Sequence, residues 1–323
     1  MQTDADSRLI SCVAGKDPDV RLFITGGTGL LGRPLIMRLL ERGDEVICVS
    51  RDPGRARGLL GPQVEVVGAD PTLPGSWQDR LAGCDAVVNL AGDPVVRGRW
   101  TTAKKQRLRR SRLATTGNVA RAVVGSDTVR VLVSASAVGY YGDSGEVALG
   151  EDAEPGQDFL ARLAVEWEHT AGMAVHEGLR VVLARIGVVL AAEGGALSLM
   201  LKPFRMGLGG PLGNGRQYFP WVHRDDLVSA LLFMVDNDQM DGPANVAVPD
   251  PPRQKDFARA LGRACGKSAI LPVPGFALKL MLGEKGEMLL AGQRAVPRSL
   301  RARGFKFAHT ELDTVLADLV GDS

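Results

Sequence analysis

Three glycines follow a short apolar run near the start of the chain, at the spacing G-x-x-G-x-x-G. They are Gly26, Gly29 and Gly32; Phe23–Thr25 before them favours a strand, and Pro34–Glu41 after them favours an amphipathic helix. Glycine at these points lets the backbone turn sharply, approach a pyrophosphate closely and pack the helix on the sheet. The free N–H groups at the start of that helix favour a phosphate anion. The pattern predicts a nucleotide cofactor rather than a turn without a ligand.

A second apolar run, Val46–Ser50, ends at the distance where dinucleotide-binding proteins recognise the adenosine ribose. Ser50 and Arg51 stand there in place of the Asp or Glu that binds the ribose 2′-hydroxyl of NAD and repels a 2′-phosphate. A guanidinium attracts that phosphate instead. We therefore expect NADP (NADPH) as the cofactor and favour it over NAD; the alternative is a solvated surface arginine.

The composition indicates a soluble protein with a substantial core. The 323 residues are 45% hydrophobic and carry a net charge of +2, which gives no overall attraction to nucleic acid. The four cysteines lack paired or metal-like spacing, and the histidines are scattered, so we expect a reducing, cytoplasmic location and no metal. The longest apolar stretch, Val181–Ala192, contains Arg185 and is too short to span a bilayer, so no membrane partner is expected.

Short apolar runs alternate with helical patterns through the first two thirds of the chain. This alternation predicts an α/β fold of the Rossmann type, a doubly wound parallel sheet covered on both faces. The predicted strands are Arg21–Thr25, Glu45–Ser50, Val64–Val67, Ala86–Leu90, Arg130–Ser134 and Leu179–Leu183. The predicted helices are Arg33–Arg42, Trp77–Ala82, Thr102–Val124 and Phe159–Glu177.

The pattern changes after Gly194. Glycine and proline in Lys202–Arg216 predict a loop. Beyond it we expect a helix at Asp225–Val235, a strand at Asn245–Val248 and short helices at Lys255–Cys265, Gly275–Leu282 and Thr310–Leu319. The predicted organisation is a flexible tail (residues 1–20), a nucleotide-binding domain (residues 21–250) and a small, mostly helical C-terminal region (residues 251–323).

Several segments occur in an order that is typical of one family. They are Thr25–Gly29, Asn89–Gly92, Ser134–Gly142 and Trp221–Asp226. With them the chain resembles an atypical extended short-chain dehydrogenase/reductase. More narrowly, it is similar to the epimerase-like subfamily that ends in a domain of unknown function, through Arg99–Thr101, Phe204–Gly210, Gly215–Tyr218 and Gly292–Ala295. The resemblance covers about residues 21–320 and implies NAD(P) binding.

The resemblance implies a place for each part of the cofactor. The glycine loop would hold the pyrophosphate, Asp70 would lie near the adenine, and Leu90–Gly92 would pass beside the nicotinamide ribose. Ser136, with Ser134 as second choice, would correspond to the catalytic serine. The expected cofactor-binding residues are Thr25, Gly26, Thr28, Gly29, Leu30, Leu31, Gly32, Ser50, Arg51, Asp70, Leu90, Ala91, Gly92 and Ser134.

The chain departs from the family at the residues that move protons. Active members carry Tyr-x-x-x-Lys on the helix after the serine, where the lysine lowers the tyrosine pKa and holds the nicotinamide ribose. Phe159 and Leu163 stand at these positions here. Tyr140 or Tyr141 is a candidate replacement for the phenol, and Arg162 for the charge. The alternatives are packing tyrosines and a surface arginine.

A basic run and a later segment supply the remaining candidates. Residues 97–112 hold eight Lys and Arg residues, and no acid occurs between Asp93 and Asp127. A solvated helix face is favoured over an anion-binding role near the site for residues such as Arg112, and nucleic acid is the last alternative. The resemblance places Trp221 and His223 on the substrate side. The favoured interpretation is that Asp225 or Asp226 caps the following helix and that His223 forms structural hydrogen bonds rather than acting as a base.

Three functions remain open from the sequence. The first is an NADP-dependent oxidoreductase or epimerase that acts on a small polar, possibly sugar-like molecule. The second is an NADP(H)-binding sensor or scaffold with little or no turnover, which the loss of Tyr-x-x-x-Lys supports. The third is a nucleic-acid-associated protein, which only the basic run supports.

Overall fold

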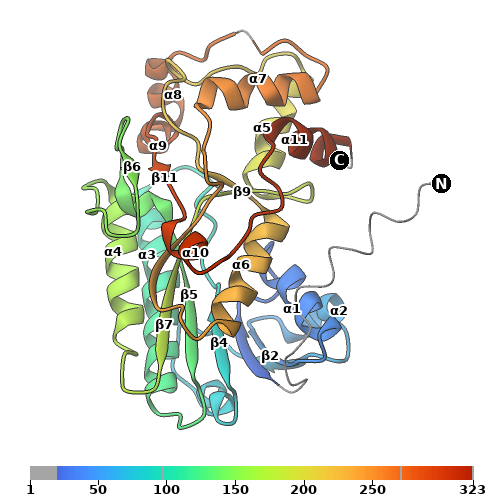
Figure 1. The fold of residues 1–323 in the computed structure, drawn as a ribbon, viewed down its shortest axis with the longest axis vertical. Helices are drawn as coiled ribbons and strands as arrows, with labels where there is room; N and C mark the ends of the chain where they lie inside the picture. Colours follow the sequence, from blue (N-terminus) through green and yellow to red (C-terminus); the bar gives the residue numbers. More distant parts are fainter. Residues whose placement is uncertain (1–19, 97, 270, 322–323) are drawn as a thin grey trace, which may run out of the picture.

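The structure is a computed structural model that describes residues 20–96, 98–269 and 271–321. The predicted N-terminal tail therefore lies almost wholly outside the described residues. Seven parallel strands form the central sheet in the order β10-β7-β5-β4-β1-β2-β3 (Figure 1). They are β1 (Arg21–Thr25), β2 (Glu45–Ser50), β3 (Glu65–Gly68), β4 (Ala86–Asn89), β5 (Val131–Ala137), β7 (Arg180–Ile186) and β10 (Gly242–Val246).

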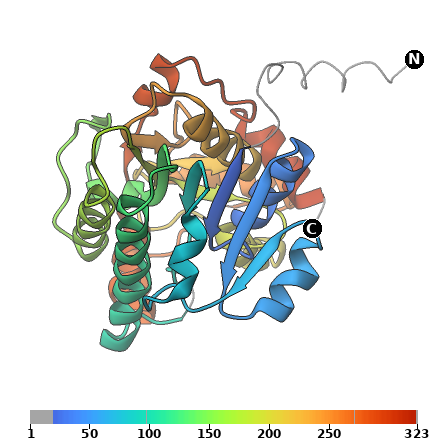
Figure 2. The same ribbon diagram turned by 90° about the horizontal axis from the view of Figure 1, so that it is seen from below.

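The two faces of the sheet have separate cores because successive side chains on each strand point to opposite sides. One core joins the sheet to α1 (Gly32–Glu41), α2 (Pro53–Leu60) and α6 (Arg224–Asp236). The other joins it to the 3-10 helix η2 (Ser76–Leu81), α3 (Thr102–Val124) and α4 (Phe159–Gly172). Figure 2 shows α3 and the strands side by side from below. This three-layer arrangement confirms the predicted Rossmann-type α/β fold.

A smaller helical region lies beyond the carboxyl ends of the strands (Figure 1). Its helices are α5 (Gly195–Arg205), α7 (Gln254–Ala264), α8 (Gly275–Leu282), α9 (Glu284–Leu290) and α11 (Leu312–Gly321). Helix α10 (Arg298–Ala302) packs against β10 instead and adds Leu300 to the core on that face of the sheet. Two short parallel pairs, β8 (Val188–Leu190) with β9 (Trp221–His223) and β6 (Ala148–Leu149) with β11 (Arg294–Ala295), connect the helical region to the sheet. The 3-10 helix η3 (Val138–Tyr141) follows β5 directly.

Several local predictions differ from the structure, and three of the differences concern helices. Helix α5 runs through Lys202 to Arg205, where a loop was expected, because Leu197, Leu201 and Phe204 bury one helix face in a core with α7 and α11. Helix α4 stops at Gly172, short of the predicted Glu177. Helix α2 was not predicted, although Asp52 caps it by accepting a hydrogen bond from the Arg55 N–H.

Candidate functional site

The glycine loop joins β1 to α1 at the point where the strand order reverses, between β1 and β4. Gly26 has φ +74°, and a Cβ there would lie 2.8 Å from the carbonyl carbon of Leu90. A Cβ on Gly32 would lie 2.4 Å from the Gly26 oxygen. Helix α1 begins without a side-chain cap and without an acid in its first turn. The loop is thus a bare, amide-lined cradle that leaves the helix end free for an anion.

Hydrogen bonds among buried side chains hold the strand ends around this loop. The Thr25 hydroxyl donates to Asn89 Oδ1 at 2.6 Å and accepts from the Ala91 N–H at 3.2 Å. Asn89 Nδ2 donates to the hydroxyls of Thr116 (2.8 Å) and Ser134 (3.2 Å). This network fixes the path of the backbone from Asn89 to Ala91. The sequence did not single out Asn89 or Thr116 as a site residue, although Asn89 is the first residue of a segment that carries the family resemblance.

On the side of the glycine loop away from β4 lie the carboxyl ends of β2 and β3. The Ser50 hydroxyl lies 3.2 Å from the Asp52 nitrogen, and Arg51 is exposed, with no ion pair to any other described residue. Residues between 67 and 77, all except Pro71 and Thr72, line a cavity of about 240 Å³, with Asp70 and Trp77 among them. Asp70 accepts hydrogen bonds from both the N–H and the hydroxyl of Thr72. Because Ser50 pairs with Gly68, the chain segment that carries the exposed Arg51 and the segment that lines the cavity start from neighbouring strand ends.

The carboxyl end of β5 carries a second network, which is built around a buried ion pair. Arg185 on β7 donates to both carboxylate oxygens of Glu168 on α4, each at 2.8 Å. The Ser136 hydroxyl donates to the same carboxylate at 2.6 Å. Arg185 also donates to the Tyr141 hydroxyl at 2.9 Å, and that hydroxyl donates to Asn245 at 2.7 Å. Two of the three candidate catalytic residues, Ser136 and Tyr141, therefore have hydroxyls that are bonded within the protein.

Burial is the main influence on the Tyr141 phenol. It raises the pKa of Tyr141, and the nearby Arg185 guanidinium only partly offsets that rise. Tyr140 differs, because its hydroxyl has no hydrogen bond within the described part of the chain. Its ring lies under the Arg185 guanidinium, with Cζ 3.5 Å from the ring centroid. Of the candidate hydroxyls, Tyr140 alone has one that is not already bonded to another described residue.

The positions of the missing Tyr-x-x-x-Lys pair are apolar in the structure as well. Phe159 packs edge-on against Trp100, with centroids 5.6 Å apart, and the Lys105 Nζ lies 4.9 Å from its ring. Leu163 is buried, one helical turn before Trp167. Arg162 is exposed and donates to the Gln157 carbonyl, so its guanidinium contacts its own helix start.

The three predicted substrate residues lie in different settings. Arg112 on α3 lies against Gly92 and the Trp167 ring. Trp221 is buried in the core shared by α5, α7 and α11. His223 caps α6 through Nδ1, which accepts the Asp225 N–H at 3.2 Å, and its ring stacks on His309 at 4.0 Å. Burial, with a smaller contribution from His309, lowers the pKa of His223.

The His223 cap predicts a pH dependence of stability. Its folded pKa lies below the unfolded value, so the unfolded chain takes up a proton first and stability falls as pH drops below about 6.5. Asparagine keeps the cap but does not titrate, so we expect His223→Asn to flatten this loss. Urea unfolding of both proteins between about pH 7.5 and pH 5.5 measures the difference. If the wild type and His223→Asn lose the same stability over this pH range, His223 is not the group responsible for the pH dependence.

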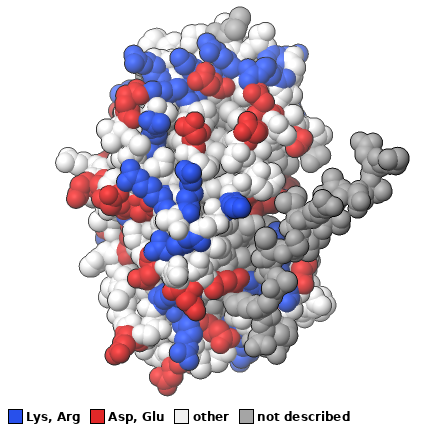
Figure 3. All heavy atoms as spheres, viewed as in Figure 1, with Lys and Arg blue, Asp and Glu red and all other residues white. Residues whose placement is uncertain are grey.

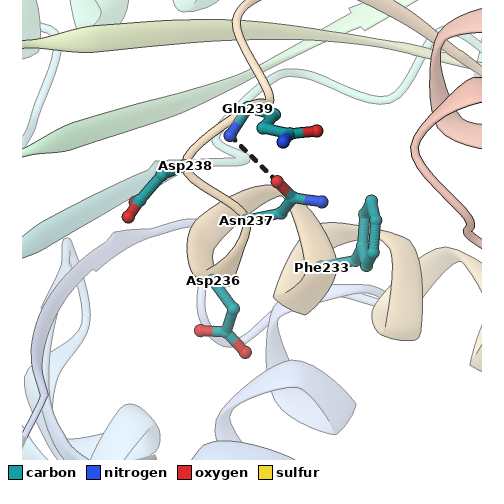
Figure 4. Close-up of a pocket in the computed structure, with 5 residues that line it drawn as sticks. All are labelled: Phe233, Asp236, Asn237, Asp238 and Gln239. Carbon is teal, nitrogen blue, oxygen red and sulfur yellow. Dashed lines mark hydrogen bonds between the residues drawn. The ribbon is translucent and has the colours of Figure 1, made fainter.

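Other surface features lie away from the strand ends. A hollow of about 550 Å³ lies at the C-terminal end of α6 (Figure 4), some 20 Å along the helix from the His223 cap. Within residues 20–321, excluding 97 and 270, no cluster of three or more His, Cys, Asp or Glu side chains forms a metal site. No helix in the same residues is long and apolar enough to cross a membrane.

A parallel sheet with a glycine loop at its switch point defines a nucleotide-binding Rossmann protein. Family models agree: residues 22–248 match the NAD dependent epimerase/dehydratase family, and residues 273–319 match a domain of unknown function, DUF1731. The chain therefore belongs to the NAD dependent epimerase/dehydratase family, and the resemblance drawn from the sequence is confirmed.

Relatives extend this assignment over nearly the whole chain. A chloroplastic homologue of epimerase family protein SDR39U1 from Arabidopsis thaliana is 36% identical over 304 residues, 93% of this chain and 87% of its own length. The crystal structure of human SDR39U1 (isoform 2) with NADPH is 33% identical, with a TM-score of 0.83, and the match covers 94% of this chain and all of that one. A nucleoside-diphosphate sugar epimerase structure from Corynebacterium glutamicum is 32% identical, with a TM-score of 0.76 over 94% of this chain and 59% of that one.

Proposed function

We propose that this protein binds NADP(H) along the carboxyl edge of its sheet and acts as an epimerase-like oxidoreductase on a small polar, possibly sugar-like molecule. The glycine cradle carries the proposal, because the absence of side chains at Gly26 and Gly32 lets the loop pack tightly against the Leu90 backbone and on itself, and a turn of this kind presents its amides to a pyrophosphate. The human relative crystallised with NADPH supports the cofactor. The bacterial relative described as a nucleoside-diphosphate sugar epimerase supports the substrate class.

The preference for NADP(H) over NAD(H) rests on Arg51. Its guanidinium is exposed and unpaired among described residues, beside the Ser50 hydroxyl, so it is available to a 2′-phosphate. Asp70 and the cavity of residues 67–77 would hold the adenine on the same side. Bound NADP(H) would supply hydride transfer at the nicotinamide. The protein residues then have to bind the substrate oxygen and exchange its proton.

Tyr140 is the residue that we assign to that proton exchange. The hydroxyls of Ser136 and Tyr141 already donate hydrogen bonds to Glu168 and Asn245, so these two residues support the ion pair around Arg185. The Arg185 guanidinium lies over the Tyr140 ring, so the ring is held at the end of β5 while its hydroxyl stays available. The competing proposal is a sensor or scaffold that binds NADP(H) with little turnover, which Phe159 and Leu163 favour.

NADPH oxidation across a panel of aldehydes, ketones and sugar carbonyls tests both proposals. We expect Tyr140→Phe to lower turnover about 100-fold or more and to leave NADPH affinity unchanged, because a positioned acid contributes that much. Tyr141→Phe is the matched control: it should lose about 1–3 kcal/mol of stability, since it leaves buried groups unpaired. Equal turnover in wild type and Tyr140→Phe overturns the role of Tyr140. NADPH binding without oxidation of any substrate supports the sensor.

The basic run gives little support to a nucleic-acid partner. Lys104, Lys105 and Arg109 form ion pairs with Asp93, Glu284 and Glu166, respectively. Acidic and basic side chains are also interspersed on the face drawn in Figure 3. The cytoplasmic location expected from the cysteines stays a prediction, and one relative is chloroplastic.

A further inference from the structure

Arg112 forms no salt bridge with a carboxylate in the described part of the chain, although the charge of Asp93, which is paired with Lys104, acts on it from nearby. Its Nη1 donates to two backbone carbonyls, those of Asp93 (3.1 Å) and Leu108 (3.2 Å). A guanidinium carries five N–H donors, and Nε and Nη2 of Arg112 have no hydrogen-bond acceptor among the described residues. Two other basic residues on the same helix, Lys104 and Arg109, each form an ion pair with a carboxylate. Arg112 therefore keeps donors available for a ligand.

The surroundings of Arg112 hold its guanidinium beside the strand ends. A Cβ on Gly92 would lie 3.3 Å from Cζ and 3.4 Å from Nη2, so the guanidinium lies directly against this backbone. The other contact is the Trp167 ring, 4.9 Å from Cζ. Trp167 is itself fixed by a hydrogen bond from its indole N–H to Thr116. Burial lowers the pKa of Arg112 to about 10, so the group stays charged at neutral pH.

The direction of a bound dinucleotide follows from the sheet order. With the pyrophosphate at the glycine loop and the adenosine half toward Arg51 on the β2 side, the other half must extend across β4 and β5. That path crosses Leu90 to Gly92 and brings the second ribose to Arg112. On the facing helix α4, Leu163 offers this ribose no donor. On α3, which packs against α4, Lys104 and Lys105 are paired with Asp93 and Glu284, whereas Arg112 has donors that no described residue uses.

We propose that Arg112 holds the hydroxyls of the nicotinamide ribose, and so positions the nicotinamide half from α3 rather than from α4. The proposal rests on NADP(H) binding, the proposed function. Arg112 is a positioning residue in this account, and the substrate contact predicted for it from the sequence is replaced by a cofactor contact.

Calorimetry with three ligands of increasing length tests it: 2′,5′-ADP, 2′-phospho-ADP-ribose and NADPH. The first lacks the second ribose and the phosphate that joins it, and the second lacks only the nicotinamide ring. Adenosine 2′-phosphate 5′-diphosphate, which has both phosphates and no second ribose, separates the two contributions and should bind Arg112→Gln as it binds the wild type. We expect Arg112→Gln to weaken NADPH and 2′-phospho-ADP-ribose by the same factor, about tenfold or more, and to leave 2′,5′-ADP unchanged. Unchanged 2′,5′-ADP binding also shows that the variant is folded. Arg112→Lys, which keeps the charge, should recover part of the loss.

Arg110→Gln is the matched control, because it removes the same charge from an exposed position on the same helix. It should leave all three affinities unchanged. If Arg112→Gln binds the three ligands as the wild type does, the assignment of Arg112 is wrong while NADP(H) binding stands. Equal weakening of all three ligands would also overturn it, since the effect would then not belong to the second ribose. If the wild type binds none of them, the proposed function itself fails.

Discussion

Replacing Arg185 with methionine is expected to lower the free energy of unfolding by about 3–5 kcal/mol, because it leaves the Glu168 carboxylate buried and unpaired. Arg185 is 3% exposed and makes two bonds to that carboxylate and a third to Tyr141. The Ser136 hydroxyl then becomes the remaining hydrogen-bond donor to Glu168. Urea unfolding at neutral pH measures the loss.

Two comparisons make this result specific to a buried pair. Arg263→Met removes an exposed pair with Asp313 and should cost less than about 1 kcal/mol. The double variant Arg185→Met with Glu168→Leu should lose less stability than the single variant, because no uncompensated charge remains. If the single variant is as stable as the wild type, the ion pair is not the structural centre of the β5 end.

Alanine at Gly26 is expected to weaken NADPH binding at least about 100-fold. The residue has φ +74°, where an L side chain is strained, and its Cβ would lie 2.8–2.9 Å from the backbone of Leu90 and Ala91. The loop can accept the methyl group only by moving away from β4, and that displaces the amides from the pyrophosphate. A total cost of about 3 kcal/mol corresponds to that factor. Calorimetric titration with NADPH measures it.

Gly58→Ala in α2 is the control for this change, because its Cβ would meet no atom within 4 Å. Alanine is also the better helix former, so that variant should bind NADPH normally and be slightly more stable. Normal NADPH binding by Gly26→Ala would contradict the proposed place of the pyrophosphate.

The fold was predictable where local pattern and tertiary packing agree. The strands of the sheet were anticipated to within a few residues, since buried parallel strands form continuous apolar runs. The boundaries of α3 matched at both ends, with Thr101 as its cap. Helix α5 was missed because Pro203 and the following glycines suggest a loop, and only contacts with α7 and α11 make that segment helical. Helix α2 does have a signal in the sequence, because Asp52 followed by Pro53 is typical of a helix start.

The site was predictable in part, and the limit lies in contacts between distant segments. The cradle follows from glycine spacing, because its chemistry is local to one loop. The bonding of Ser136 to Glu168 joins residues 32 positions apart, and that of Tyr141 to Asn245 joins residues 104 apart. The periodicity of the sequence does not predict hydrogen bonds between residues so far apart along the chain. Whether the Tyr140 hydroxyl and the Arg112 guanidinium have donors available for a ligand likewise depends on the hydrogen bonds that their neighbours form, and the sequence does not show these.

Titration of the purified protein with NADPH and with NADH in a calorimeter tests the central claim, which is that the edge of the sheet binds a dinucleotide and selects its 2′-phosphate. We expect saturable heat with NADPH and an affinity for NADH that is at least about tenfold lower, because NADH has no 2′-phosphate for the Arg51 guanidinium to bind. Absence of heat with both dinucleotides at millimolar concentration would contradict the binding site. Equal affinities would contradict the role of Arg51.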